Sequence, residues 1–320
     1  MELIKQISNI GIVPVIKIKD ISKAVPLAKA LIDGGLPIAE VTFRAADADK
    51  AIKAMSEAYP EMIIGAGTVL TIEQAKLAKE CGAKFIVAPG FNPKVVQWCI
   101  DNDILVTPGI STPSEIEQAL EMGLKTVKFF PAEQSGGIAK IKAMAAPYGD
   151  VTFMPTGGIG LDNMNDYLSF KKIVACGGSF MVKEDLIDNC EWDKITDLTK
   201  KAVAKMLDFK FAHIGINNAN EEEAIKSAKM LSLVSGMPFT KESAKGIFVG
   251  TDFEVMKSKG PGTNGHIGIK TNNVDRAVYH LSKLGVEFDE TTAMYNDDGS
   301  RKFIYVKDEI AGFMLHIVQA

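Results

Sequence analysis

The feature that most restricts the fold is a regular alternation of two kinds of segment between residues 10 and 180. Short apolar runs rich in β-branched residues alternate with longer segments of helical, amphipathic periodicity. Near-continuous apolar runs are typical of parallel strands covered on both faces. Eight strands alternating with helices predict an α/β fold, a closed (β/α)8 TIM barrel, although an open parallel sheet fits the same pattern. The runs are IVPVIK (12–17), IAEVTF (38–43), MIIGAGTV (62–69), FIVAPG (85–90), ILVTPGI (104–110), TVKFFP (126–131), TFMPTGG (152–158) and KIVACGG (172–178).

The rhythm changes near residues 207–210, after a segment, 191–206, that is predicted to be the closing helix of the barrel. Two similar units follow, and each begins with His-Ile-Gly-Ile on a strand, continues with a helix and ends with further strands. The two copies are offset by about 53 residues, which is an internal repeat with too few copies for a solenoid. The sequence therefore predicts a smaller α+β domain of two βαβββ repeats, whose half-sheets close on each other face to face.

Composition excludes several classes of partner. The formal net charge is −4 and no Lys/Arg-rich run is present, so we expect no nucleic-acid binding. No apolar stretch approaches the ~20 residues that a membrane-spanning helix needs, and the N-terminus lacks the features of a signal peptide. The four cysteines are widely spaced without a C-x-x-C pair, which is typical of reduced thiols. We therefore expect a cytoplasmic protein without a membrane partner.

One lysine stands in an unusual place. Lys128 lies in the apolar run TVKFFP, between Val127 and Phe129, and in this fold the C-terminal strand ends carry the active site. A lysine buried among apolar side chains is costly unless it lines a polar cavity. Desolvation favours the neutral, nucleophilic form of an amine, which can attack a ketone. The alternative is a lysine whose ammonium reaches solvent at the strand end.

Three polar residues of EVTFR share one face of the second predicted strand, because side chains alternate with a period of two. They are Glu40, Thr42 and Arg44. A buried carboxylate can transfer protons, and a guanidinium can bind a substrate carboxylate through two parallel hydrogen bonds. The alternative is a structural ion pair between Glu40 and Arg44.

Glycine pairs follow the seventh and eighth predicted strands, in PTGGI (155–159) and GGS (177–179). Barrels commonly hold phosphate on backbone N–H groups at these two strands, and glycine lets an anion approach the main chain closely. The pairs therefore predict a site for phosphate or a similar anion. GAGT (65–68) and the Pro-Gly pairs at 89–90 and 108–109 are expected to shape the mouth of the barrel.

The segments VPVI, EVTFR, GAGTV, APG, PGIST, KFFPAE, PTGGI and GGS, in this order, resemble the 2-keto-3-deoxy-6-phosphogluconate and 4-hydroxy-2-oxoglutarate aldolases over about residues 1–206. The resemblance implies a class I aldolase barrel at 1–207, a homotrimer, in which pyruvate forms a Schiff base with Lys128 and no metal is needed. It implies Glu40 as the acid/base. The substrate-binding residues that it implies are Arg44, Thr68, Pro89, Thr156, Gly157, Gly158, Gly178 and Ser179.

Two departures from the family pattern leave the preferred keto-acid open. Many relatives have Ser where this chain has Ala88, and Trp where it has Phe180. The phosphorylated six-carbon acid is the first choice, because the glycine pairs are intact; 4-hydroxy-2-oxoglutarate comes next, and a galactonate stereoisomer is a further alternative. Two other functions compete: a phosphate-sugar isomerase or epimerase on the same barrel, and a metal-dependent enzyme of the second domain with the barrel as scaffold or sensor.

The histidines of the second domain occupy matched places in the repeat. His213 and His266 lie on the first strand of each unit, and Glu254 and His316 on the last. Such a set suits zinc, nickel, cobalt, iron or manganese. The pattern resembles the vicinal-oxygen-chelate, or glyoxalase-like, superfamily over about 209–320, which implies a domain at 208–320. The alternatives are a copy without metal and a regulatory or oligomerising module; His280 is expected on a helix surface.

Overall fold

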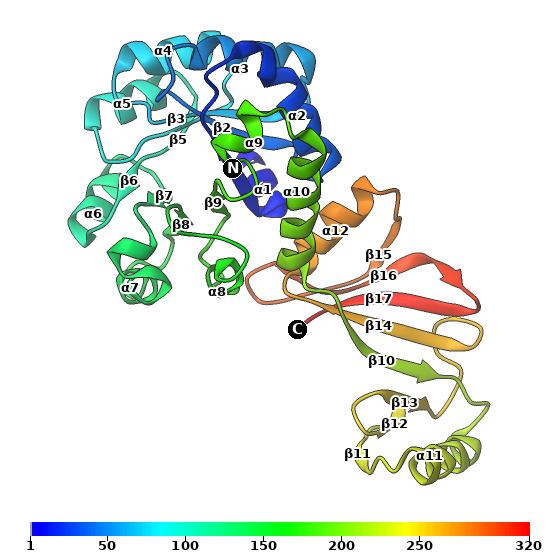
Figure 1. Cartoon of the computed structure of the whole chain (residues 1–320). Helices are drawn as coiled ribbons and strands as arrows, with labels where there is room; N and C mark the ends of the chain where they lie inside the picture. The colour runs from blue at the N-terminus through cyan, green and yellow to red at the C-terminus, as the bar shows by residue number, and fades with distance from the viewer. Residues whose placement is uncertain (1) are drawn as a thin grey trace. The chain divides into compact units, whose positions relative to one another are not determined.

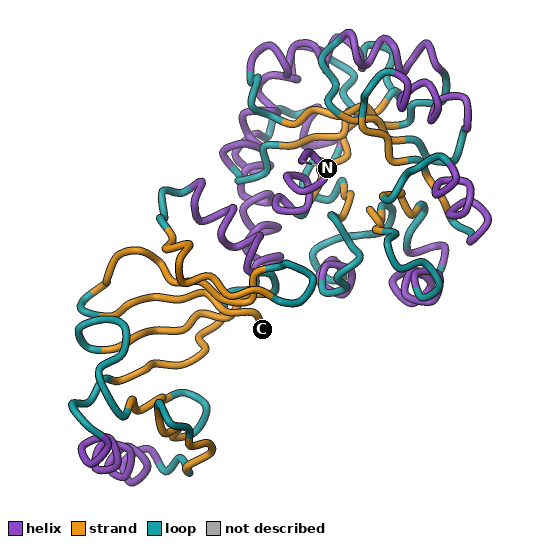
Figure 2. The backbone as a smooth tube through the Cα atoms, turned by 180° about the vertical axis from the view of Figure 1, so that it is seen from behind, coloured by secondary structure: helices purple, strands orange, loops and turns teal. Residues whose placement is uncertain are grey.

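The computed structural model describes residues 2–320, and the chain forms two compact units, Met1–Met206 and Leu207–Ala320 (Figure 1). The first unit has an α/β fold in which helices lie outside the strands (Figure 2). Its strands are β1 (Ile12–Ile16), β2 (Ile38–Thr42), β3 (Ile63–Gly67), β4 (Phe85–Val87), β5 (Leu105–Thr107), β6 (Gly109–Ile110), β7 (Thr126–Phe129), β8 (Thr152–Pro155) and β9 (Cys176–Gly178). Its α-helices are α1 (Glu2–Ile10), α2 (Ala24–Asp33), α3 (Ala48–Ala58), α4 (Ile72–Glu80), α5 (Pro93–Asp101), α6 (Pro113–Glu121), α7 (Gly137–Ala145), α8 (Met164–Leu168), α9 (Glu184–Asp188) and α10 (Trp192–Leu207), with short 3-10 turns η1 (Ile21–Lys23) and η2 (Glu133–Ser135).

The strands of the first unit all pair in parallel. One sheet has the order β5-β4-β3-β2-β1-β9, and a second has the order β6-β7-β8. Two isolated parallel bridges, Phe153–Ile173 and Thr156–Gly177, connect β8 to the segment that contains β9. Parallel strands deliver their carboxyl ends to one edge, which brings together the polar residues that follow them.

Local sequence explains where several helices of this unit begin. Thr112 and Glu115 form a complete capping box at α6, and Pro113 occupies a first-turn position where its missing N–H costs nothing. The Thr71 side chain accepts a hydrogen bond from the Gln74 backbone N–H at the start of α4. Each cap fixes the end of a loop that runs from a strand to the next helix. These loops are therefore held by the strand at one end and by the capped helix at the other.

The second unit is built around one eight-stranded sheet with the order β11-β12-β13-β10-β14-β17-β16-β15. Each repeat contributes one strand, one helix and three strands, as its pattern predicted. The first repeat holds β10 (Lys210–Ile216), α11 (Glu221–Ser235), β11 (Phe239–Glu242), β12 (Gly246–Val249) and β13 (Phe253–Met256). The second holds β14 (Gly265–Thr271), α12 (Val274–Lys283), β15 (Phe288–Tyr295), β16 (Arg301–Ile310) and β17 (Phe313–Gln319).

The two half-sheets of this unit do not close face to face, which corrects the sequence-based prediction. They join edge to edge, because the first strands of the two repeats, β10 and β14, pair antiparallel at the centre of the sheet. This pairing satisfies the backbone N–H and C=O groups of both central strands, which face-to-face packing would leave unpaired at two edges.

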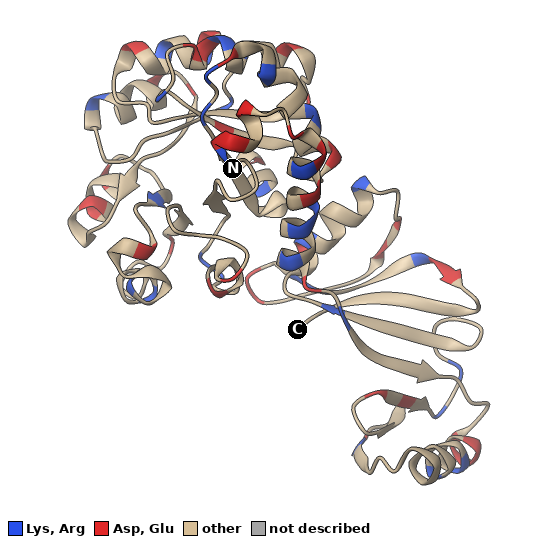
Figure 3. Ribbon diagram, in the orientation of Figure 1, with Lys and Arg blue, Asp and Glu red and all other residues tan. Residues whose placement is uncertain are grey.

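The charged side chains of both signs are interspersed along the helices (Figure 3). Pairs such as Lys29–Asp33, with 2.6 Å between nitrogen and oxygen, follow the i,i+4 spacing of helix surfaces. Within residues 2–320, none of the helices combines the length and apolar character needed to cross a bilayer.

Candidate active site and candidate metal centre

A cavity of about 290 Å³ opens among the carboxyl ends of the strands in the first unit. Every residue that the sequence assigned to catalysis or substrate binding in this unit lines it, although the assignments come from six separate segments of the chain. Five further residues complete the lining: Val15, Thr42, Phe130, Ile159 and Gly177. The topology therefore gathers the predicted residues at one place, as expected for strand ends in a parallel sheet.

A buried lysine and a buried glutamate form the polar centre of the cavity. Lys128 on β7 is 5% exposed, Glu40 on β2 is 1% exposed, and 3.2 Å separates Nζ of the lysine from Oε1 of the carboxylate. The Nζ atom also lies 5.3 Å from the centre of the Phe130 ring. Glu40 Oε2 makes no hydrogen bond to any described residue. A desolvated amine beside a carboxylate with a free oxygen can act as nucleophile and proton carrier.

Glu40 does not form the alternative ion pair with Arg44, because its described partner is Lys128. Arg44 lines the same cavity, and its Nε donates a hydrogen bond of 3.3 Å to Thr42 Oγ1. Thr42 Oγ1 in turn donates to the carbonyl oxygen of Ile16 at 2.8 Å. Thr42 thus orients the guanidinium, whose two terminal amino groups have no hydrogen-bond partner within residues 2–320 and are available to a carboxylate.

Two glycines make room for the polar groups of the site, and sequence reasoning missed their role. A Cβ atom on Gly67 would lie 2.2 Å from Glu40 Oε1, and one on Gly177 would lie 2.3 Å from Thr156 Oγ1. Real Cβ atoms do not approach other atoms so closely, so each position requires glycine. The signal was present in GAGT and in the glycine pair at 177–178, but which side chain each glycine faces depends on neighbouring strands.

The distal end of the cavity is formed by main chain. Gly157 and Gly158 have left-handed φ angles of 104° and 76°, which favour glycine. A Cβ on Gly158 would meet the Glu133 side chain at 2.7 Å. Gly178 and Ser179 line the same cavity, and the Thr156 Oγ1 atom is buried without a hydrogen-bond partner in the described chain. Backbone N–H groups and hydroxyls of this kind can hold an anion.

Comparison with known proteins identifies this unit. A family model described as KDPG and KHG aldolase matches residues 3–198, which is more than half of the chain. The chain belongs to the KDPG and KHG aldolase family. Aldolases of this family are carbon–carbon lyases, and the protein is an enzyme of this class. The match ends before the second compact unit begins at Leu207.

Individual aldolases resemble the chain over nearly their whole length. The 2-dehydro-3-deoxy-phosphogluconate aldolase of Haemophilus influenzae is 48% identical over 202 residues, which cover 63% of this chain and 95% of that protein. The KHG/KDPG aldolase of Escherichia coli is 43% identical and covers 60% of this chain and 90% of its own length. The KDPG aldolase of Legionella pneumophila, solved with pyruvate captured as a covalent carbinolamine intermediate, is 36% identical with a TM-score of 0.61; the match covers 62% of this chain and 97% of that one.

A second cluster of reactive groups lies on one face of the sheet in the second unit of this aldolase. The Nε2 atoms of His213 and His266 are 3.1 Å apart, and those of His213 and His316 are 3.4 Å apart. Glu254 Oε2 lies 3.2 Å from His266 Nε2 and 3.5 Å from His213 Nε2. The structure therefore brings together all four residues that the sequence proposed as metal ligands, and three imidazole nitrogens with one carboxylate suit a divalent transition metal.

The strand register explains this convergence. In the central antiparallel pair, His213 lies opposite Gly268 and His266 lies opposite Gly215. The outer parallel pairs then place Glu254 beside Gly215 and His316 beside Gly268. Each row across the sheet thus reads ligand, glycine, ligand, and residues in such rows share a face.

The two glycines of the His-Ile-Gly-Ile repeats provide the space for the rings. A Cβ on Gly215 would lie 2.1 Å from Cε1 of His266, and a Cβ on Gly268 would lie 2.8 Å from Cε1 of His316. Gly215 and Gly268 therefore allow imidazoles from neighbouring strands to lean over them. This is the structural reason for the Gly in each repeat, which the sequence showed only as a repeated letter.

Burial and mutual proximity determine the charge of these groups. Burial, followed by repulsion from His213 and His266, lowers the pKa of His316 to about 3. Burial and then His266 also lower the pKa of His213, against the opposing effect of Glu254. The hydrogen bond from His266 is the main cause that lowers the pKa of Glu254. Near neutral pH the cluster therefore presents unprotonated imidazole of His213 and His316 beside an ionised carboxylate.

Aromatic side chains surround the cluster. The ring centres of Phe248 and His213 are 5.9 Å apart, and those of Phe303 and His316 are 4.6 Å apart. Tyr305 packs against His316 with 5.3 Å between ring centres. Burial and then the charge of Glu254 raise the pKa of Tyr305 to about 12. The cluster is therefore a polar site in contact with three aromatic rings.

His280 differs from the sequence-based expectation. It lies on α12 and is only 6% exposed, so it is a buried residue and not a helix-surface one. Val274, Ala277 and Val278 form the apolar face of this short amphipathic helix, and His280 is buried although it lies outside that face.

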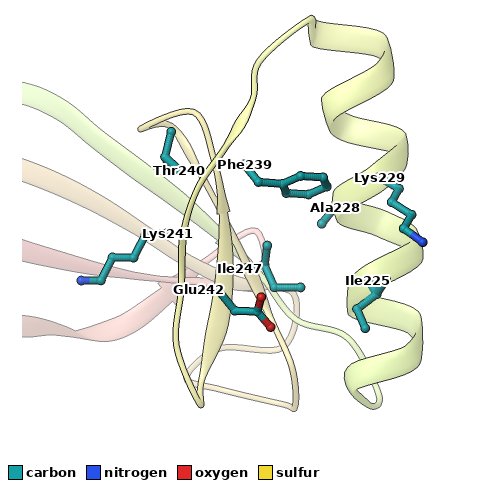
Figure 4. Close-up of a pocket in the computed structure, with 8 residues that line it drawn as sticks. All are labelled: Ile225, Ala228, Lys229, Phe239, Thr240, Lys241, Glu242 and Ile247. Carbon is teal, nitrogen blue, oxygen red and sulfur yellow. The ribbon is translucent and has the colours of Figure 1, made fainter.

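A separate crevice of about 440 Å³ lies between α11 and the strands β11 and β12 (Figure 4). Ala228 and Ile247 lie inside it, and the Phe239 ring points toward α11. Lys229 and Lys241 point away from it, on the outer side of the helix and on the far side of the strand. The crevice contains none of the predicted site residues and no arrangement of reactive groups.

Proposed function

We propose that the first unit is a class I aldolase that cleaves 2-keto-3-deoxy-6-phosphogluconate to pyruvate and glyceraldehyde 3-phosphate, and 4-hydroxy-2-oxoglutarate to pyruvate and glyoxylate. The observation that carries the proposal is the buried contact of 3.2 Å between Lys128 Nζ and Glu40 Oε1. Named relatives that act on these two keto-acids support the substrate class.

In this mechanism the Lys128 amine attacks the C2 carbonyl of the keto-acid, and loss of water gives a Schiff base. Cleavage of the C3–C4 bond releases the aldehyde as a base accepts the proton of the C4 hydroxyl. The electron pair of the broken bond passes into an enamine, which is protonated at C3 and hydrolysed to pyruvate. Glu40 is suited to move these protons because its Oε2 atom has no hydrogen-bond partner among the described residues. No step requires a metal.

The substrate is proposed to bind with its carboxylate at one end of the cavity and its phosphate at the other. Arg44, oriented by Thr42, would hold the pyruvyl carboxylate, with Thr68 and Pro89 beside it. The glycine pairs, Thr156 and Ser179 would hold the distal phosphate on main-chain N–H and hydroxyl groups. The buried contact between Lys128 and Glu40 favours this function over a phosphate-sugar isomerase, because an isomerase does not need a buried lysine nucleophile.

We also propose that the strands of the first unit form one closed (β/α)8 barrel. The two parallel sheets are interrupted only at Pro108, between β5 and β6, and at the bridges that lead from β8 to β9. The pairing of β9 with β1 joins the last strand to the first, as a closed barrel requires. By resemblance to its family the enzyme is proposed to be a homotrimer, which sedimentation equilibrium can test.

The decisive test is reductive trapping. The full-length protein is incubated with pyruvate and borohydride, and the adduct is located by intact mass and peptide mapping. We expect one reduced pyruvyl group on Lys128, and neither adduct nor pyruvate release in Lys128→Ala. The matched control is Lys140→Ala, which removes a lysine whose Nζ lies 5.8 Å from the centre of the Phe129 ring and leaves Lys128 in place. Turnover by folded Lys128→Ala would refute the mechanism.

For the second unit we propose a vicinal-oxygen-chelate domain that binds one divalent metal ion, zinc, nickel, cobalt, iron or manganese, through His213, Glu254, His266 and His316. The convergence of three Nε2 atoms and a carboxylate oxygen over two obligatory glycines supports this proposal. A metal held there would polarise a ligand oxygen. An isomerase or lyase acting on a related sugar acid fits such a site; a regulatory module is the alternative.

Metal binding can be measured with Co²⁺ alone, by equilibrium dialysis and visible absorption of the full-length protein. We expect one tightly bound ion per chain, lost in His266→Ala. The matched control is His280→Gln, which removes the one histidine outside the cluster. Equal Co²⁺ binding by the parent and by folded His266→Ala would refute the assignment of the ligands.

A further inference from the structure

The glycine pair at the distal end of the aldolase cavity is held on one side by the segment that follows the strand of the catalytic lysine. The backbone N–H of Ala132 donates a hydrogen bond of 2.8 Å to the carbonyl oxygen of Thr156. The backbone N–H of Glu133 donates one of 3.1 Å to the carbonyl oxygen of Gly157. A Cβ on Gly158 would lie 2.7 Å from Cβ and Cγ of Glu133. The methylene part of the Glu133 side chain therefore lies directly against the glycine pair.

The same loop is held on its other side by the start of helix α8. Asn163 Oδ1 accepts a hydrogen bond of 2.9 Å from the backbone N–H of Gly160, and Asn163 Nδ2 donates one of 3.1 Å to the carbonyl oxygen of Gly158. The backbone N–H of Met164 donates to the carbonyl oxygen of Gly160 at 3.0 Å. The position of the loop from Gly158 to Gly160 is thus tied to the position of α8.

A tyrosine–glutamate hydrogen bond joins these two supports. Tyr167 on α8 is 1% exposed, and its hydroxyl donates to Oε1 of Glu133. Burial, followed by this hydrogen bond, raises the pKa of Tyr167, so the hydroxyl keeps its proton and remains a donor. A hydrogen bond to an ionised carboxylate is about twice as strong as one between neutral groups. The bond therefore fixes α8 against the segment that contacts the glycine pair.

The bond also determines where the Glu133 carboxylate points. A Cβ on Gly137 would lie 3.3 Å from both Glu133 Oε1 and Tyr167 Oη, so the carboxylate lies beside Gly137 and the tyrosine. The residues that line the cavity in the described chain include neither Glu133 nor Tyr167. The pair therefore acts on the site through the main chain of the glycine pair and not by touching the substrate.

We infer that Glu133 and Tyr167 are positioning residues for the distal phosphate, and that their hydrogen bond keeps the N–H groups of Gly157 and Gly158 in the geometry that binds it. The inference rests on the proposed aldolase function and adds a determinant of its substrate preference. The pair favours the phosphorylated six-carbon acid, whereas 4-hydroxy-2-oxoglutarate has no phosphate and does not depend on it.

The test compares cleavage of the two keto-acids by full-length Tyr167→Phe, which keeps the ring and removes the donor. KM for 2-keto-3-deoxy-6-phosphogluconate should rise about tenfold, the lower end of the effect of one hydrogen bond to a charged group. Its kcat, and both constants for 4-hydroxy-2-oxoglutarate, should stay within about threefold of the parent. The matched control is Tyr148→Phe, which removes a hydroxyl that donates to Glu117 Oε1 at 2.9 Å in an exposed pair and should change neither substrate.

A second variant tests whether the two residues act as a pair. Glu133→Ala removes the acceptor and should raise the same KM at least as much as Tyr167→Phe does. Combining the two substitutions should raise it by less than a further threefold, because the shared hydrogen bond is already lost. A further tenfold rise in the double variant would show that the residues act separately and would overturn the inference.

The remaining outcomes separate this inference from the proposed function. A parental KM for the phosphorylated acid in Tyr167→Phe, or an equal loss on both keto-acids, would overturn the positioning role and leave the aldolase function intact. If the parent neither cleaves the keto-acids nor forms the pyruvate adduct, the proposed function is refuted and this inference with it.

Discussion

Replacing Gly67 with alanine tests whether the position of the Glu40 carboxylate governs turnover. Gly67 ends β3 and pairs in register with Thr42 on β2, two residues from Glu40. An added Cβ would lie 2.2 Å from Glu40 Oε1 and 2.7 Å from its Cγ. The substitution changes no charged or hydrogen-bonding group, so it acts on the geometry of the catalytic pair alone.

The size of the effect follows from these distances. A carbon–oxygen contact of ordinary length needs about 1 Å more than the 2.2 Å available, so the carboxylate has to move by about that amount from its present position beside Lys128 Nζ. A misplacement of about 1 Å at a reacting group costs about 10²-fold in rate. Overpacking a buried site costs about 1–3 kcal/mol, which lowers the melting temperature of a unit this size by about 2–12 °C.

The assay separates chemistry from folding. Steady-state cleavage of 2-keto-3-deoxy-6-phosphogluconate gives kcat, and borohydride trapping with pyruvate shows whether Lys128 still reacts. We expect Gly67→Ala to form the adduct while kcat falls about 10²-fold. The control is Gly149→Ala, because a Cβ at Gly149 has no atom within 4 Å. A kcat within threefold of the parent would refute the reasoning that Glu40 must stay in its present position.

Three further predictions follow from the two sites. Glu40→Gln keeps the size of the side chain but cannot carry protons, so kcat should fall by about 10²–10⁴-fold while the pyruvate adduct still forms; a near-normal rate would remove Glu40 from proton transfer. Exhaustive dialysis against EDTA should leave aldolase activity unchanged, because Lys128 and Glu40 need no metal; lost activity that returns with added metal would contradict this. Gly268→Ala should weaken Co²⁺ binding at least tenfold, because its Cβ would lie 2.8 and 2.9 Å from Cε1 of His316 and His213; dialysis that shows parental affinity would argue against a site built on that glycine.

The sequence alone determined the fold class of the first unit and predicted its chemistry, because both inferences rest on local patterns. Continuous apolar runs predict buried parallel strands, and the structure confirms an α/β unit with parallel pairing. A lysine between Val127 and Phe129 is conspicuous wherever it occurs in a buried strand. The family match over residues 3–198 confirms that the chain belongs to the aldolases. The roles of the individual residues remain predictions.

Only the tertiary structure decided which residues face each other. That the half-sheets of the second unit join edge to edge, that Gly67 faces Glu40, and that His213 lies opposite Gly268 all depend on strand pairing and register. The burial of His280 is likewise a tertiary property, because the helical pattern of α12 places it outside the apolar face. Periodicity reports which face of a strand or helix is apolar, but partners distant in the chain are selected by packing and backbone hydrogen bonding of the whole sheet.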